Sequence, residues 1–274
     1  MKIRKLTSIL ASAGFAALLA SCSDIAENER LVYTPPVEVS RAVLVEDFTG
    51  QRCVNCPAAA AAIKQLQNQY GENTVITVGI YSGQFGHTAN GNKPLPLTTE
   101  TGQAYFEHWK IEGQPAVLFN RASGILNDGS QFSNAVRQQL QSPTPVNMTM
   151  DVDYDETAQN VTVDVSALSS EAVSGKLQVW VLEDSIVSPQ TMPDPETGVT
   201  ITNKEYVHNH VFRSSVTSDI WGDALNITKD EAATASYTFA VDAAWKTKNL
   251  SIVAFVYNDN GVMQAIRRDV VKKD

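Results

Sequence analysis

The chain has 274 residues, of which 43% are hydrophobic and 19% are charged. This composition is typical of a globular protein and excludes a disordered one, and the length is sufficient for two ordinary domains. The formal net charge of −9 offers no basic surface to nucleic acid, so nucleic acid is not an expected partner.

The first 21 residues have the features of a bacterial signal peptide. A basic start, MKIRK, precedes an apolar stretch at 6–20 that is too short to cross a bilayer comfortably. The stretch ends in LASC at 19–22, which resembles a lipobox, where cleavage exposes Cys22 for acylation. An ordinary signal peptide with a chance cysteine is the alternative. We expect acyl chains such as palmitate on Cys22, and through them the membrane as a partner.

Residues 22–40 are polar and acidic and contain two adjacent prolines, which predicts a tether between the membrane and the folded part. Its acidic start resembles the surface-export signal of Bacteroidetes lipoproteins.

Residues 41–142 alternate strand and helix patterns. Apolar, β-branched runs predict strands at 41–48, 74–81 and 115–120, with a short fourth strand at 122–126. Helix-forming runs predict helices at 56–70, 99–109 and 130–141, and residues 82–98 form a Gly/Asn/Pro-rich loop. This alternation predicts an α/β fold whose sheet is covered on both faces.

The pattern changes after a linker, SPTP, at 142–145. Period-two or strand-forming runs separated by turn signals lie at 146–154, 160–168, 175–183, 235–242 and 249–258. They predict a second, all-β domain over 146–274, an antiparallel sandwich of the immunoglobulin-like kind. The interval 185–235 is less regular, with loops and one strand around 205–213.

The strand at 41–48 leads into Cys53 and Cys56 at the predicted strand-to-helix junction. At a helix start, backbone amides and the helix dipole favour a thiolate on Cys53, and Cys56 follows one turn later as a resolving thiol. A zinc half-site would need two more ligands, and no other cysteine is available, so no metal is expected. A working redox pair and a passive disulfide both remain open at this point.

These residues resemble the thioredoxin superfamily, over about 100 residues. The strand VLVEDF runs into CVNC, Asp47 lies six residues before Cys53, and the run GQPA at 113–116 opens the next strand. The resemblance implies a thioredoxin-like domain over 41–142 and a Cys53–Cys56 disulfide. It also implies proton relay by Asp47 and substrate binding at Gln114 and a cis Pro115. Asp47 could instead be a capped or solvated acid.

Three features depart from the thioredoxin pattern. Arg52 replaces the tryptophan before the first cysteine, and Val54-Asn55 replaces the inner Gly-Pro. The spacing from Cys56 to Pro115 is also longer, because of the 82–98 loop. These departures leave the redox potential and the substrate open.

The whole layout resembles the 28-kDa outer-membrane-protein family of Bacteroidetes lipoproteins. The resemblance implies a lipid-anchored protein of the bacterial outer membrane, on its periplasmic face or at the cell surface. One hypothesis is a thiol–disulfide oxidoreductase that acts on protein thiols or disulfides, with no cofactor. The other is a non-catalytic binding or adhesion lipoprotein in which the disulfide is structural. Nothing in the sequence predicts the oligomeric state.

Several aromatic and histidine residues have two interpretations. In a strand, His208 and His210 would share a face and could bind a metal, but hydrogen-bonded histidines are the simpler reading. His87 lies in the 82–98 loop, where it could contact a substrate or be solvated. Trp109 belongs to the α/β part. The other tryptophans are expected in the β-domain core: Trp180, Trp221 and Trp245.

Overall fold

The computed structural model describes residues 40–86 and 97–272. The predicted signal peptide, Cys22, the tether up to residue 39 and His87 lie outside this range. The described residues group into one compact unit. None of the helices in the described ranges is both long enough and apolar enough to span a membrane.

Three α-helices form where the sequence predicts them, namely α1 (Cys56–Tyr70), α2 (Glu100–His108) and α3 (Phe132–Gln141). Helix α1 is rich in alanine, has Pro57 in its first turn, where a missing N–H costs least, and ends at Gly71 with a positive φ of 92°. Helix α2 begins after Thr99, whose side chain accepts a hydrogen bond from the Gly102 amide at 2.9 Å.

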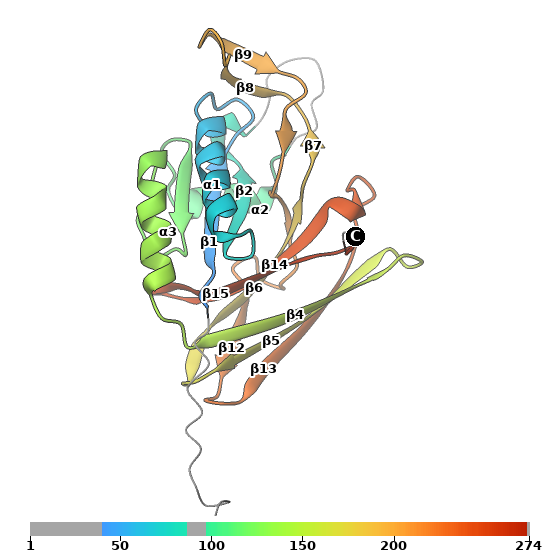
Figure 1. Ribbon diagram of the computed structural model, residues 1–274. Coiled ribbons are helices and arrows are strands. Elements are labelled where there is room, and N and C mark those ends of the chain that lie inside the picture. Colours follow the sequence, from blue (N-terminus) through green and yellow to red (C-terminus); the bar gives the residue numbers. More distant parts are fainter. Residues whose placement is uncertain (1–39, 87–96, 273–274) are drawn as a thin grey trace, which may run out of the picture. The chain divides into compact units, whose positions relative to one another are not determined.

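The strands of the first half are almost entirely buried. Strand β1 (Val43–Thr49) pairs in parallel with β2 (Val75–Tyr81) and antiparallel with β3 (Ala116–Phe119). Helices α1 and α3 cover one face of these strands, and α2 covers the other (Figure 1). The predicted covering of both faces is therefore confirmed.

The prediction of a fourth strand at 122–126 is wrong. This segment contributes only one isolated β-bridge, between Val117 and Leu126.

The second half is almost all β. Its long strands are β4 (Val146–Asp155), β5 (Asn160–Ser169), β6 (Val173–Glu183), β13 (Ala232–Ala240), β14 (Leu250–Asn258) and β15 (Gly261–Asp269). Its short strands are β7 (Ile186–Val187), β8 (Gln190–Pro193), β9 (Thr200–Asn203), β10 (Val207–His208), β11 (Val211–Ser215) and β12 (Asp223–Ile227). The sheet β13-β5-β4 packs against β6, β12 and β14 through alternating apolar side chains, so two layers of strands enclose one core.

One sheet continues through both halves of the chain. Its order is β15-β14-β6-β11-β2-β1-β3, and the two halves meet where Val211 of β11 pairs with Gly79 of β2. Trp180 is fully buried beside this junction, with its ring 5.3 Å from both Tyr105 of α2 and Phe212 of β11. The described residues therefore form a mixed α/β structure that is mostly β, and the sheet crosses the boundary predicted at 142–146. The division into two domains stays a prediction.

The run at 205–213 is not the single strand that its composition predicts. Strands β10 and β11 are separate, and between them His210 adopts a positive φ of 56°. A left-handed residue breaks the alternation of side chains, so His208 and His210 do not occupy equivalent positions of one strand.

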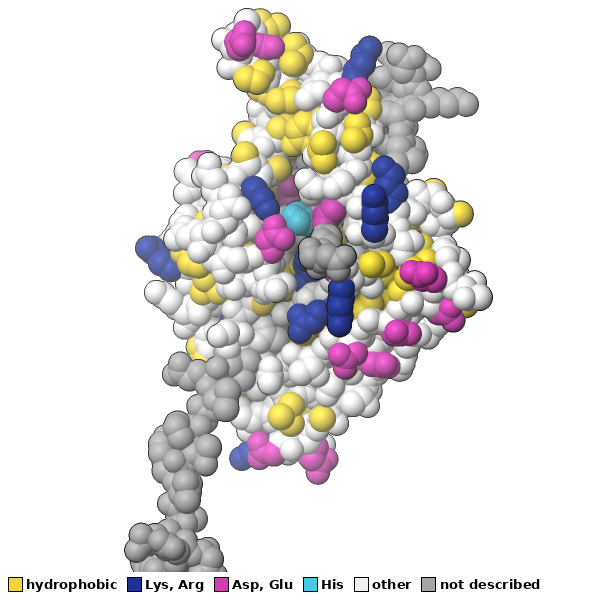
Figure 2. All heavy atoms as spheres, turned by 45° about the vertical axis from the view of Figure 1, so that its right-hand side comes forward, with side chains coloured by type: hydrophobic (Ala, Val, Ile, Leu, Met, Phe, Trp, Pro, Cys, Tyr) yellow, Lys and Arg dark blue, Asp and Glu magenta, His cyan; other side chains and the backbone are white. Residues whose placement is uncertain are grey.

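Residues 184–210, here called the 184–210 segment, contain β7 to β10. Figure 2 shows hydrophobic side chains gathered at the end of the molecule that β8 and β9 form. The exposed valines of this segment are Val187, Val199 and Val207.

Candidate functional site

The two cysteines lie between β1 and α1 and form a disulfide with an S–S distance of 2.01 Å, as predicted. The helix begins at Cys56, so Cys53 lies in the loop before it rather than at the helix start that the spacing predicts. The Cys53 amide donates to the Gly50 carbonyl at 3.0 Å, which closes this loop. Both cysteines are buried, with 3% exposure for Cys53 and 2% for Cys56.

Pro115 lies at the same end of the sheet as the cysteine loop. Because Ala116 pairs with Phe48 in an antiparallel register, Pro115 comes opposite Thr49, the last residue of β1. The Gln114 side-chain amide donates to the Thr49 carbonyl at 2.7 Å and to the Ser82 carbonyl at 3.1 Å. The Gln114–Pro115 peptide bond is cis, as predicted.

Asp47 occupies the middle of β1, opposite Gly79 of β2 and Val117 of β3. It is 4% exposed, and its Oδ1 atom has no hydrogen-bond partner among the described residues. Burial raises the pKa of the Asp47 carboxyl to about 7, because the charged form loses its hydration. A carboxyl with this pKa can both give and take a proton near neutral pH.

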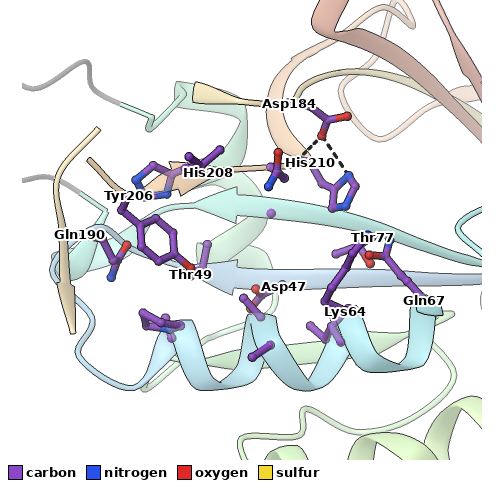
Figure 3. Close-up of a pocket in the computed structure, with 18 of the residues that line it drawn as sticks. Asp47, Thr49, Lys64, Gln67, Thr77, Asp184, Gln190, Tyr206, His208 and His210 are labelled. Atoms are coloured by element: carbon purple, nitrogen blue, oxygen red, sulfur yellow. Dashed lines mark hydrogen bonds and ion pairs between the residues drawn. The ribbon is translucent and has the colours of Figure 1, made fainter. Parts of the chain in front are cut away.

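A cavity of about 490 Å³ adjoins this carboxyl. Asp47 and Cys56 both line it, α1 provides one wall, and the 184–210 segment provides another (Figure 3). Gly79 leaves room beside Asp47, since a Cβ atom there would meet its nearest neighbour only at 3.5 Å. The cavity therefore brings the buried acid and one sulfur-bearing residue to the same space.

The 184–210 segment is attached directly to the cysteine loop. The Gln190 side-chain amide donates to the carbonyls of Cys53 at 3.0 Å and Gly50 at 3.2 Å. The Thr191 amide donates to the Gln51 carbonyl at 2.8 Å. These bonds join the disulfide loop to residues more than a hundred positions later in the chain.

His208 is held as a neutral side chain inside this wall. Its Nε2 atom lies 3.0 Å from the Ser188 carbonyl, which can only accept, so Nε2 carries the proton. Its Nδ1 atom therefore accepts from the Tyr81 hydroxyl at 2.7 Å. Burial lowers the pKa of His208 to about 4.

His210 has a different partner from His208. Its Nδ1 lies 3.1 Å from Oδ1 of Asp184, and its amide donates to the same oxygen at 2.7 Å (Figure 3). Burial alone would raise the pKa of Asp184, but hydrogen bonds and charge from His210, with the charge of Arg267, lower it to about 2. His208 bonds through its ring and His210 through its backbone amide, and within the described ranges no group of three or more His, Cys, Asp or Glu side chains is placed to hold a metal ion.

Sequence reasoning finds Cys53, Cys56, Asp47 and Pro115 because motif spacing marks them. It misses Gln190 and Tyr206, although both line the cavity with Asp47. The 185–235 interval has no regular hydrophobic period, and nothing in its local pattern indicates that it covers a site in the other half of the chain.

The likeness to solved structures concerns the fold. HBP35 of Porphyromonas gingivalis matches with a TM-score of 0.63 and 19% identity, over 84% of this chain and 76% of that one. A domain of the outer membrane lipoprotein Omp28 from Porphyromonas gingivalis is 24% identical over 46% of this chain and 88% of that one, with a TM-score of 0.32. No curated protein matches the chain.

The sequence model of the family described as outer membrane protein Omp28 matches residues 102–274, which is more than half of the chain. The matched range includes Pro115 and the 184–210 segment, and it does not include Asp47, Cys53 or Cys56. The predicted location at the bacterial outer membrane agrees with this family and is confirmed by it, while the lipid anchor on Cys22 stays a prediction. The chain belongs to the Omp28 family of outer membrane proteins.

Proposed function

We propose that this outer-membrane lipoprotein is a thiol–disulfide oxidoreductase acting on protein thiols or disulfides outside the cytoplasm. In this proposal residues 41–142 are a thioredoxin-like domain and residues 146–274 an immunoglobulin-like sandwich. The single observation that carries the proposal is that Asp47 and Cys56 line the same cavity. The pKa of the Asp47 carboxyl is about 7, so this acid can exchange a proton with a thiol near neutral pH. A buried acid of this pKa costs stability at neutral pH and suits proton transfer.

The chemistry needs no cofactor. A client thiolate attacks the sulfur of Cys53, a new client–Cys53 disulfide forms, and the Cys53–Cys56 bond breaks to leave a Cys56 thiolate. The Asp47 carboxyl then gives its proton to that thiolate. In the reverse step, Cys56 returns the proton to Asp47 and attacks Cys53, which releases the client thiolate. Atoms and electrons balance in both directions.

The surroundings of the disulfide suit a polypeptide client. Pro115 and Gln114 lie at the end of β1 from which the cysteine loop begins, where they would position the client backbone. Val187 and Val207 are cross-strand partners with 53% and 48% exposure, in the segment bonded to the cysteine loop. Exposed apolar pairs of this kind favour contact with apolar parts of an unfolded chain.

Burial of the disulfide supports a second candidate function. Both cysteines are almost fully covered, which is expected of a disulfide that only stiffens a scaffold. The protein would then be a non-catalytic binding or adhesion lipoprotein.

The Cys56→Ala variant distinguishes the two candidates. Without its resolving thiol, Cys53 is expected to accumulate mixed disulfides with clients in cells, seen as adducts that a reductant removes on non-reducing gels. The control is the full-length chain with Cys53→Ala and Cys56→Ala together, which should form none. In parallel, the wild-type chain is expected to accelerate the reduction of insulin by dithiothreitol. Absence of adducts together with no acceleration would favour the structural disulfide.

A second variant tests the apolar pair. Changing Val187 and Val207 to lysine in the Cys56→Ala background is expected to lower the yield of adducts by roughly threefold or more, because the client loses its apolar contact. Both side chains are exposed, so little stability should be lost. The matched control is Leu168→Lys, since Leu168 is also exposed, at 43%, but lies on β5. Equal adduct yields in the two variants would exclude this surface as the client contact.

A further inference from the structure

A second cavity, of about 580 Å³, lies on the other face of the sheet from the disulfide cavity. Successive side chains of a strand point to opposite faces of the sheet. In β1, Asp47 lines the first cavity, and its neighbour Glu46 bonds to Arg121, which lines the second. The two cavities share no lining residue. The volume of the second cavity is within the range of about 300–1,000 Å³ that is typical of small-molecule sites.

Aromatic side chains from separate parts of the chain form the walls of this cavity. His108 and Trp109 come from the end of α2, Trp221 from the loop before β12, and Tyr257 from β14. The His108 ring lies 4.3 Å from the Trp221 ring and 5.1 Å from the Trp109 ring. Trp109, Trp221 and Tyr257 are only half-buried, although each could have filled a core.

Hydrogen bonds hold these walls in place. The Trp221 amide donates to Asp219 at 2.9 Å, and its carbonyl accepts a hydrogen bond from the Tyr257 hydroxyl. The Tyr105 ring packs against Trp221 at 5.0 Å. The aromatic surfaces are therefore fixed before any ligand arrives, which lowers the entropic cost of binding.

The charges around the cavity cancel. Arg121 lies 4.6 Å from the Tyr257 ring centre and is neutralised by Glu46, whose oxygens accept its hydrogen bonds at 2.8 and 2.9 Å. Lys176 and Asp259, which also line the cavity, carry opposite charges. A phosphate or another strongly charged group would gain little net attraction here.

We propose that this cavity binds an uncharged sugar. The apolar C–H face of a sugar ring would pack on the indole and phenol rings, as apolar groups do on aromatic faces. Its hydroxyl groups would form hydrogen bonds with Lys176 and Asp259, which line the cavity. A purely aromatic ligand would leave these polar groups without partners.

The test uses the full-length protein and four uncharged disaccharides: cellobiose, maltose, lactose and N,N′-diacetylchitobiose. Binding is measured by saturation-transfer NMR and by titration of tryptophan fluorescence. At least one sugar is expected to bind, and Trp221→Ala should weaken it roughly tenfold. The matched control is Trp245→Ala, because Trp245 packs against Arg213 away from this cavity and should leave binding unchanged.

Lys176→Met provides a second variant in case Trp221→Ala does not fold, since this half-buried lysine has no ion-pair partner within 4 Å among the described residues. It should weaken sugar binding while leaving the melting temperature unchanged. The proposal is overturned if none of the four sugars binds the wild-type chain. It is also overturned if indole-3-acetamide binds and the sugars do not, or if binding is lost equally in Trp245→Ala.

Discussion

Replacing Arg121 with methionine is expected to lower the free energy of unfolding by roughly 3–5 kcal/mol. The side chains of Arg121 and Glu46 are 3% and 0% exposed and form a two-bond ion pair. Methionine removes the partner of a fully buried carboxylate, which must then remain charged without a counter-ion or take up a proton. The measurement is urea unfolding at pH 7, with the m-value monitored to confirm that the native state is unchanged.

A double variant separates the value of the pair from the cost of leaving one charge alone. Glu46→Leu combined with Arg121→Met replaces both charges with apolar groups, and it should recover most of the stability that the single variant loses. The rings of Trp180 and Phe255, which lie 5.6 and 4.9 Å from the Arg121 guanidinium, offer apolar surroundings for the new methionine. If the double variant is as unstable as the single one, packing rather than charge determines the role of Arg121.

Local sequence signals account for the parts of the fold that could be predicted. Helix α1 begins and ends as expected because an alanine-rich run is bounded by an early proline and a final Gly71. Strands β4 and β5 match their predicted ranges closely because every second side chain is apolar. In both cases the information lies within about ten to fifteen neighbouring residues.

Contacts between distant residues account for what could not be predicted. The sheet continues from one half to the other through the pairing of Gly79 with Val211, which no local pattern marks. The left-handed backbone of His210 ends β10 in a run whose composition favours a single strand. The aromatic cavity draws its walls from α2, β6, β14 and the loop before β12, so Trp109 and Trp221 could not be associated from the sequence.

In the candidate site, too, local signals could be predicted from the sequence and long-range contacts could not. The CVNC spacing marks the disulfide, and GQPA marks the cis proline, because both signals are local. The cover provided by Gln190 and the 184–210 segment depends on hydrogen bonds to the cysteine loop from more than a hundred residues away.

Replacing Asp47 with asparagine is expected to change stability and activity in opposite directions. Burial raises the pKa of Asp47 from 3.8 to about 7, so the folded state holds a proton that the unfolded chain releases above pH 4. Its contribution to stability is complete below pH 4 and is lost as the pH rises through 7, a loss of about 4 kcal/mol. Asparagine cannot ionise, so the variant should be more stable than wild type at pH 8, by up to that amount.

If the proposed redox function holds, the same substitution removes the proton donor for Cys56. Insulin reduction at pH 7 should then slow by roughly a hundredfold. The wild-type rate should depend on pH around 7, and the variant rate should lose that dependence. A variant that is more stable but as active as wild type would show that the buried acid does not take part in exchange.

His208 supplies the internal control for the stability measurement. Burial lowers its pKa from 6.5 to about 4, so its contribution is present above pH 6.5 and is lost as the pH falls through 4. Between pH 4 and 6.5 the two groups therefore act against each other in the wild-type protein. In Asp47→Asn only the histidine effect remains, and stability should fall on acidification over this range.

The difference in unfolding free energy between the wild-type protein and Asp47→Asn, measured by urea unfolding from pH 4 to 8, should grow steadily up to about pH 7. A constant difference would mean that Asp47 does not hold its proton in the folded state.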